Sequence, residues 1–214
     1  HSIISPCFFS GMHTEVFDDR QIEILLWLKA FSKSFYLVGG TAIALHLGHR
    51  RSIDFDLFRS SPLVKHRIKA KLQQIPFKQV PLSEDVDQLH LLINGVKTTF
   101  FYFPYPIDHP VKLENFFSVP TLLTLASMKA FAMGRRAKWK DYVDLYFILK
   151  NHYTIQEICR EGEKNFTNQF SEKLFREQLA FHKDIDYSEP IVYMDKPVPE
   201  EKIREFLIDK ALEI

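Results

Sequence analysis

Two aspartates, Asp54 and Asp56, flank Phe55 in an otherwise apolar stretch. A strand over residues 53–58 would place both carboxylates on one face and turn Ile53 and Phe55 toward the core. Two like charges so close repel each other and lose solvation when they are covered. A divalent cation removes both costs, and Mg²⁺ commonly takes one or two carboxylates together with substrate phosphates. The pair therefore predicts a Mg²⁺ (or Mn²⁺) site, with two solvated surface acids as the alternative.

A glycine pair, Gly39-Gly40, lies upstream of the aspartates. The segment before it, Phe35–Val38, is aromatic and β-branched and predicts a strand, whereas Thr41–Leu47 predicts a short helix. Glycine lets the backbone approach a phosphate, and a helix N-terminus offers N–H donors and the positive end of a dipole. Thr41 adds a hydroxyl at the same turn. A phosphate cradle beside a metal pair is the arrangement that phosphoryl or nucleotidyl transfer requires.

The remaining elements predict a mixed α/β region over residues 1–110 and a helical region over residues 111–214. In the first region Asn94-Gly95 is a strong hairpin signal, and Asp18 or Asp19 fits a helix N-cap. The expected elements of this region are a helix at 18–31, strands at 35–38 and 53–58, a basic helix at 62–74, and strands at 89–93 and 97–103. The expected helices of the second region lie at 118–133 (closed by Gly134), 139–149, after the capping box of Thr154 and Glu157, 174–181 and 200–211.

Composition excludes few functions. The 28 basic and 27 acidic residues give a net charge of +1, so overall charge does not indicate a nucleic-acid partner. Two cationic runs, at 65–71 and 135–140, would suit a polyanion such as RNA, or they are solvated helix faces. Cys7 and Cys159 have no metal-binding spacing. No apolar run reaches the roughly 20 residues that span a bilayer, so we expect a cytoplasmic protein without a membrane partner.

The segment VGGTAIALHLGHRRSIDFDLF, at 38–58, resembles the first motif of the nucleotidyltransferase superfamily with a polymerase-β-like fold. More narrowly, it is similar to the AbiEii/AbiGii family of abortive-infection toxins, which carry GG-T-A-x-x-L and then R-x-S-x-D-[IFL]-D. Either Arg50 or Arg51 fits the arginine of this motif. A second stretch, at 125–149, is similar to the family segment K-x-x-A-x-x-x-R-x-x-x-K-D-x-x-D-L. Its matching positions are Lys129, Ala132, Arg136, Lys140, Asp141 and Asp144.

The resemblance implies an α+β fold, with a nucleotidyltransferase-like mixed sheet core followed by a helical C-terminal region. It implies transfer of a nucleoside monophosphate from an NTP to an acceptor hydroxyl of RNA (tRNA included) or protein. It further implies the toxin of a toxin–antitoxin system, whose antitoxin is a separate chain. Asp54 and Asp56 would hold the metal ion. The nucleotide would be bound by Gly39, Gly40, Thr41, Arg51, Ser52 and Lys129, and the catalytic residues would be Asp54, Asp56, Lys129 and Asp141.

Lys129 and Asp141 also have explanations that involve no ligand. Lys129 lies in an uncharged stretch, where a lysine extends its charged end to solvent, pairs with an acid or binds a ligand. Asp141 would align Lys129 or contact the nucleotide, but an acid in the first turn of a helix is also stabilised by the helix dipole.

One departure from the superfamily pattern concerns a third acid, which many members carry on a later strand beside the aspartate pair. The corresponding stretch at 97–103 has none, and we expect Glu84, Asp85 and Asp87 in a loop. This absence favours one alternative to the toxin, a weak or inactive protein that binds a nucleotide or a partner on the same fold. A further alternative is a nucleotidyltransferase acting on a small molecule such as an antibiotic.

Overall fold

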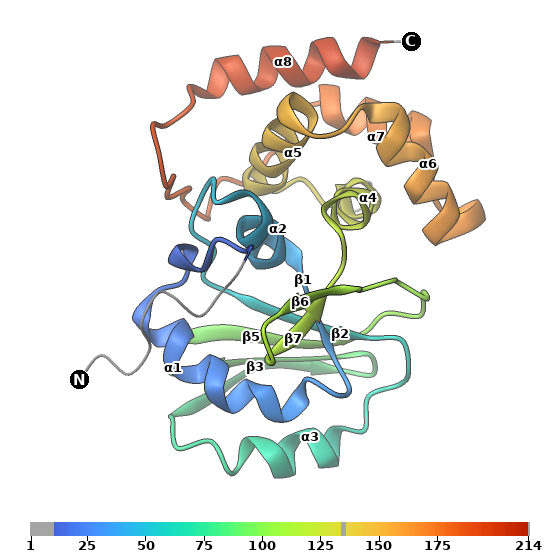
Figure 1. Cartoon of the computed structure of the whole chain (residues 1–214). Coiled ribbons are helices and arrows are strands. Elements are labelled where there is room, and N and C mark those ends of the chain that lie inside the picture. Colours follow the sequence, from blue (N-terminus) through green and yellow to red (C-terminus); the bar gives the residue numbers. More distant parts are fainter. Residues whose placement is uncertain (1–10, 134–135, 214) are drawn as a thin grey trace. The chain divides into compact units, whose positions relative to one another are not determined.

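The computed structural model describes residues 11–133 and 136–213. The chain divides into two compact units, residues 1–121 and 122–214 (Figure 1). Residues 111–119, predicted to belong to the helical region, form a β-hairpin in the N-terminal unit. Cys7, Gly134 and Arg135 lie outside the described residues. In the described part of the chain, every helix is too short or too polar to cross a membrane.

A five-stranded mixed sheet organises the N-terminal unit, in the order β1-β2-β5-β4-β3. Strand β2 pairs antiparallel with β1 and parallel with β5, and the other two pairings are antiparallel. The elements are η2 (Thr14–Val16), α1 (Asp19–Leu28), η3 (Lys29–Phe31), β1 (Tyr36–Val38), α2 (Gly39–Leu47), β2 (Phe55–Arg59), α3 (Lys65–Leu72), β3 (Gln79–Asp85), β4 (Gln88–Ile93), β5 (Val96–Tyr102), β6 (Val111–Leu113) and β7 (Phe117–Val119).

One face of this sheet is the core of the unit. Phe55, Leu57 and Phe100 point to it and are fully buried. The ring of Phe31 lies 4.8 Å from that of Phe100, centroid to centroid, which packs the end of the α1–η3 segment onto the sheet. Helices α1 and α3 lie along this side (Figure 1). The alternate residues of the strands, Asp56 among them, therefore point to the opposite face.

Local signals account for several element ends. The side chain of Asp18 caps α1 in a capping box with Gln21. Asn94 and Gly95 both have positive φ, 53° and 78°, as a tight hairpin turn requires. Gly48 ends α2 in the left-handed conformation.

Two expectations for the N-terminal unit are wrong. Glu84 and Asp85 belong to strand β3 rather than to a loop, and only Asp87 lies in the turn that follows. The strand that was expected to begin at Ile53 begins at Phe55. Ile53 is 61% exposed and does not join the core.

The C-terminal unit is helical. Its elements are α4 (Leu122–Met133), α5 (Trp139–Asn151), α6 (Ile155–Phe166), η4 (Thr167–Gln169), α7 (Glu172–Ala180) and α8 (Glu200–Leu212). Thr154 and Glu157 form the predicted capping box of α6. Stacked rings of Phe131 and Phe166, 4.1 Å apart, join α4 to α6.

Candidate active site

The carboxylate of Asp56 lies against the first turn of α2. Asp56 pairs with Val38, the last residue of β1, so its side chain emerges where β1 passes into the helix. Gly39 has φ +75°, and a Cβ atom there would stand 2.1 Å from Oδ2 of Asp56. Only glycine fits this position, because a side chain would meet both backbone strain and the carboxylate.

A buried arginine occupies the next position of the same turn. A Cβ atom on Gly40 would stand 2.5 Å from Nη2 of Arg50 and 3.3 Å from Oγ of Ser52. Arg50 is only 3% exposed, and its Nη1 donates to the carbonyl of Arg51 at 2.9 Å. The first backbone N–H groups of a helix have no partner within the helix. With a guanidinium beside them, they form a site suited to a phosphate.

Arg51, which was expected to contact the triphosphate, points elsewhere in this structure. Its side chain is exposed and donates from Nη1 to the carbonyl of Phe17 at 3.2 Å. Of the two arginines that fit the motif, Arg50 is therefore the one beside the glycine pair.

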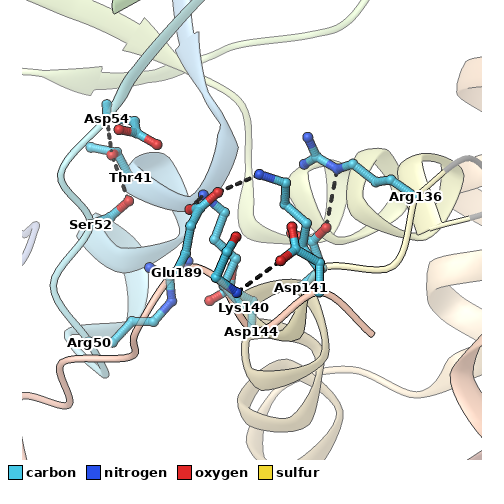
Figure 2. Close-up of polar contacts among 12 residues, drawn as sticks. Thr41, Arg50, Ser52, Asp54, Arg136, Lys140, Asp141, Asp144 and Glu189 are labelled. Carbon is cyan, nitrogen blue, oxygen red and sulfur yellow. Dashed lines mark hydrogen bonds and ion pairs between the residues drawn. The ribbon is translucent and has the colours of Figure 1, made fainter. Parts of the chain in front are cut away.

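Thr41 and Ser52 shape the loop that carries the first aspartate. The Thr41 hydroxyl is buried and hydrogen-bonds to Oγ of Ser52 at 2.9 Å and to the main-chain oxygen of Asp54 (Figure 2). Gln21, on α1, donates to the carbonyl of Ser52 at 2.8 Å. These contacts fix the loop before β2 to α1 and α2. Thr41 and Ser52, which were predicted to bind the nucleotide, hold Asp54 in place in this structure.

Asp54 and Asp56 are both half-buried, Asp54 in this loop and Asp56 on β2. Throughout residues 11–133 and 136–213, no three His, Cys, Asp or Glu side chains gather to hold a metal ion by themselves. Two carboxylates beside a phosphate cradle suit Mg²⁺, which leaves other positions to phosphate oxygens and water. The residues present therefore fit a cation that arrives with a nucleotide.

A polar pair that is not predicted from the sequence, Thr99 and His90, extends this face of the sheet. Asp56 is in register with Thr99 on β5, and Thr99 is in register with His90 on β4. Nδ1 of His90 lies 3.0 Å from Oγ1 of Thr99, and its Nε2 lies 3.0 Å from Oε1 of Gln88. The Asn94-Gly95 turn could have revealed the pair, because a two-residue turn there sets residue 90 opposite residue 99.

In the C-terminal unit, Lys129 is held between two buried carboxylates. Its Nζ lies 2.7 Å from Oδ1 of Asp141 and 2.7 Å from Oδ2 of Asp144. The lysine side chain is 5% exposed and both carboxylates are fully buried. Helices α4 and α5 are thus joined by a desolvated ion cluster, in which loss of one partner leaves an uncompensated charge.

Arg136 adds a second cation to this cluster. Its Nε lies 3.3 Å from Oδ2 of Asp141, while its side chain remains 53% exposed (Figure 2). Burial by itself would raise the pKa of Asp141, but the charges of Lys129 and Arg136 outweigh it and hold the pKa below its ordinary value. Asp141 also lies in the first turn of α5, where the helix dipole favours its charge.

Both cationic runs are partly neutralised. On α3, Lys69 and Lys65 pair with Glu84 at 2.8 Å and 3.4 Å. In the C-terminal unit, Lys138 and Lys140 both pair with Glu189. Burial alone would raise the pKa of Glu189, but the two lysines lower it to about 2. These lysines therefore offer a polyanion less positive charge than the sequence suggests.

Comparisons with known proteins bear on both units. A family model described as nucleotidyl transferase AbiEii toxin, type IV toxin–antitoxin system, matches residues 22–118. An uncharacterized protein of Aquifex aeolicus (strain VF5) is 30% identical over 185 residues, covering 84% of this chain and 87% of that protein.

Two solved structures share the fold. MenT4, a nucleotidyltransferase toxin from Mycobacterium tuberculosis H37Rv, superposes with a TM-score of 0.58 at 15% identity, covering 89% of this chain and 80% of its own. A protein from H. pylori that is assigned as a nucleotidyltransferase gives 0.55 at 14% identity, covering 90% of this chain and 92% of its own. The predicted mixed sheet core with a helical C-terminal region is confirmed.

Proposed function

Because the chain belongs to the AbiEii family of nucleotidyltransferase toxins, we propose that it transfers a nucleoside monophosphate from an NTP to an acceptor hydroxyl and releases pyrophosphate. The observation that carries this proposal is the contact between the Asp56 carboxylate and Gly39 at the N-terminus of α2. It sets a group that can hold a cation directly beside a backbone that can hold a phosphate.

The N-terminal unit supplies the nucleotide site in this proposal. The N–H groups of Gly39 and Gly40 and the guanidinium of Arg50 bind phosphate oxygens. Asp54 and Asp56 hold Mg²⁺ (or Mn²⁺), which when bound would neutralise charge on the phosphates. Thr41 acts indirectly, because its hydroxyl holds the main chain of Asp54.

For the C-terminal unit, we assign Lys129 and Asp141 a positioning role. Lys129 already faces two carboxylates, so the three groups together carry a net negative charge. That charge disfavours Lys129 itself as the main phosphate ligand. Lys129 keeps Asp141 ionised, and Asp141 orients Arg136, whose half-exposed guanidinium would contact an anionic group of a substrate.

We further propose that the acceptor is RNA or protein and that a separate antitoxin chain restrains the activity. The family description, which names a type IV toxin–antitoxin system, supports this role. The second candidate is a nucleotide-binding protein without turnover. It is favoured by one observation, the absence of an acid on β5, where Thr99 stands beside Asp56.

The test is a transfer assay with each labelled NTP, Mg²⁺ and total cell extract, followed by nuclease or protease digestion of the labelled product. We expect one NTP to label a macromolecule. Asp56→Asn should lower the rate by about 100-fold or more, since it removes a metal ligand. Asp108→Asn, at an exposed position of the same unit, should retain the rate. Nucleotide binding without label transfer would contradict the proposal and support the second candidate.

A further inference from the structure

Three neighbouring strands carry a row of polar side chains on the face opposite the core. Asp56 on β2, Thr99 on β5 and His90 on β4 occupy successive register positions. Residues paired across adjacent strands point to the same face, so the row runs sideways from the proposed metal ligand. Thr99 is 5% exposed and His90 is half-buried.

The neighbours of His90 favour one tautomer. Nε2 of the ring faces Oε1 of Gln88, an acceptor, at 3.0 Å, so the neutral ring with its hydrogen on Nε2 satisfies this contact. In that tautomer Nδ1 holds a lone pair, and the Thr99 hydroxyl, 3.0 Å away, donates to it. The Thr99 oxygen keeps its own lone pairs, with which it can accept a hydrogen bond from an incoming hydroxyl.

We propose that Thr99 and His90 together accept the proton of the acceptor hydroxyl, in the place where a third acid would act. This inference rests on the function proposed above. The acceptor O–H bond breaks, its proton moves to Oγ1 of Thr99, and the proton of Thr99 moves to Nδ1 of His90, which becomes imidazolium. The acceptor oxygen bonds to the α-phosphorus, and the bond from that phosphorus to pyrophosphate breaks, with the electron pair leaving on pyrophosphate.

The surroundings of His90 suit a base. Burial and the positive charge of Lys97 on β5 lower the pKa of His90, while the charge of Asp56 on β2 acts in the opposite sense. On β3 the facing residue is Ser83, which does not titrate. Burial and Lys97 therefore favour the neutral imidazole, which is the form that can take up a proton.

The experiment measures the pH dependence of label transfer, in the assay described above, from about pH 5 to 9. The wild-type rate should rise as His90 loses its proton and then level off. His90→Ala should lower the rate by about 100-fold, remove that rise, and recover in part when imidazole is added. Thr99→Val should behave like His90→Ala without rescue, whereas Thr99→Ser should keep most of the rate. His66→Ala, on the exposed face of α3, is the matched control.

Binding of a fluorescent NTP analogue, measured in parallel, should be unchanged in all variants. Wild-type transfer with the same pH profile in His90→Ala overturns this inference and leaves the proposed function standing. Loss of nucleotide binding in both His90→Ala and Thr99→Val also overturns it, because the pair is then structural. Absence of transfer by the wild type overturns the proposed function and this inference with it.

Discussion

Gly39 and Asp56 constrain each other. The residue that begins α2 must adopt φ +75°, and it must also leave room for the carboxylate oxygen of Asp56. The first requirement is one of backbone strain and the second is one of space. They can be separated, because Gly11 has a similar φ of +94° but nothing within 4 Å of the place where a Cβ atom would stand.

We therefore expect Gly39→Ala to do two things. It should destabilise the protein by about 1–3 kcal/mol through the left-handed backbone, and it should weaken NTP binding by about tenfold or more by displacing Asp56. Urea unfolding and titration with a fluorescent NTP analogue measure the two effects. Gly11→Ala should show strain alone, with nucleotide affinity unchanged. Normal affinity in Gly39→Ala would mean that the contact has no role in the site.

At the scale of elements, α4 and α5 depend on a buried ion cluster. Lys129→Met keeps the length of the side chain but leaves Asp141 and Asp144 without their shared cation. We expect a loss of about 3–5 kcal/mol at neutral pH. The lysine and Arg136 lower the pKa of Asp141. In the wild type, the stabilisation from Asp141 is therefore present above its unfolded pKa and is lost as the pH falls through the lower folded value.

In Lys129→Met this balance changes, because burial raises the pKa of Asp141 and the lysine no longer opposes it. The loss of unfolding free energy relative to wild type should therefore become smaller as the pH falls and the carboxylates bind protons. Urea unfolding at neutral pH and at about pH 5 measures this trend. Lys173→Met, at a side chain that is 86% exposed, should leave the unfolding midpoint unchanged at both pH values. If the loss of unfolding free energy in Lys129→Met does not depend on pH, it arises from lost packing rather than from the unpaired carboxylates.

The elements that the sequence predicted well carry local signals. The Asn94-Gly95 turn and the capping box of α6 are each determined by residues within one short stretch of sequence. Strand β3 was missed because it is an edge strand, exposed along most of its length and interrupted by Pro81, so no apolar alternation marks it. Strands β6 and β7 span three residues each, too few for a periodic pattern.

For the candidate site, spacing along the chain predicted which segments meet but not which side chains do. The glycine pair and Asp56 come together because β1 and β2 are neighbours in the sheet. The choice between Arg50 and Arg51 depends on how the loop before β2 is tied to α1 and α2, which no local pattern encodes. The contact of Lys129 with Asp141, at 2.7 Å, agrees with one of the two roles expected for Asp141, the alignment of Lys129, and does not test the other, contact with the nucleotide.

At the scale of the whole molecule, nearly balanced charge gives no general attraction to nucleic acid, and many of the clustered lysines are already paired. The proposed macromolecular acceptor would therefore be recognised by specific contacts rather than by a broad basic surface. The biological consequence of transfer separates the toxin from an enzyme that modifies a small molecule, because only modification of an essential macromolecule should stop growth.

We expect induced expression of the wild-type chain, without an antitoxin, to arrest growth of a bacterial host. Asp56→Asn should relieve the arrest, because the proposed transfer depends on Asp56 as a metal ligand, while Asp108→Asn should remain toxic. Colony counts after induction measure the effect, and immunoblots confirm equal protein levels. Equal toxicity of Asp56→Asn would assign the arrest to binding rather than to transfer. If the wild-type chain is active in the transfer assay but the host grows normally, a small-molecule or non-essential acceptor is favoured. Nucleotide transfer would then occur without stopping growth.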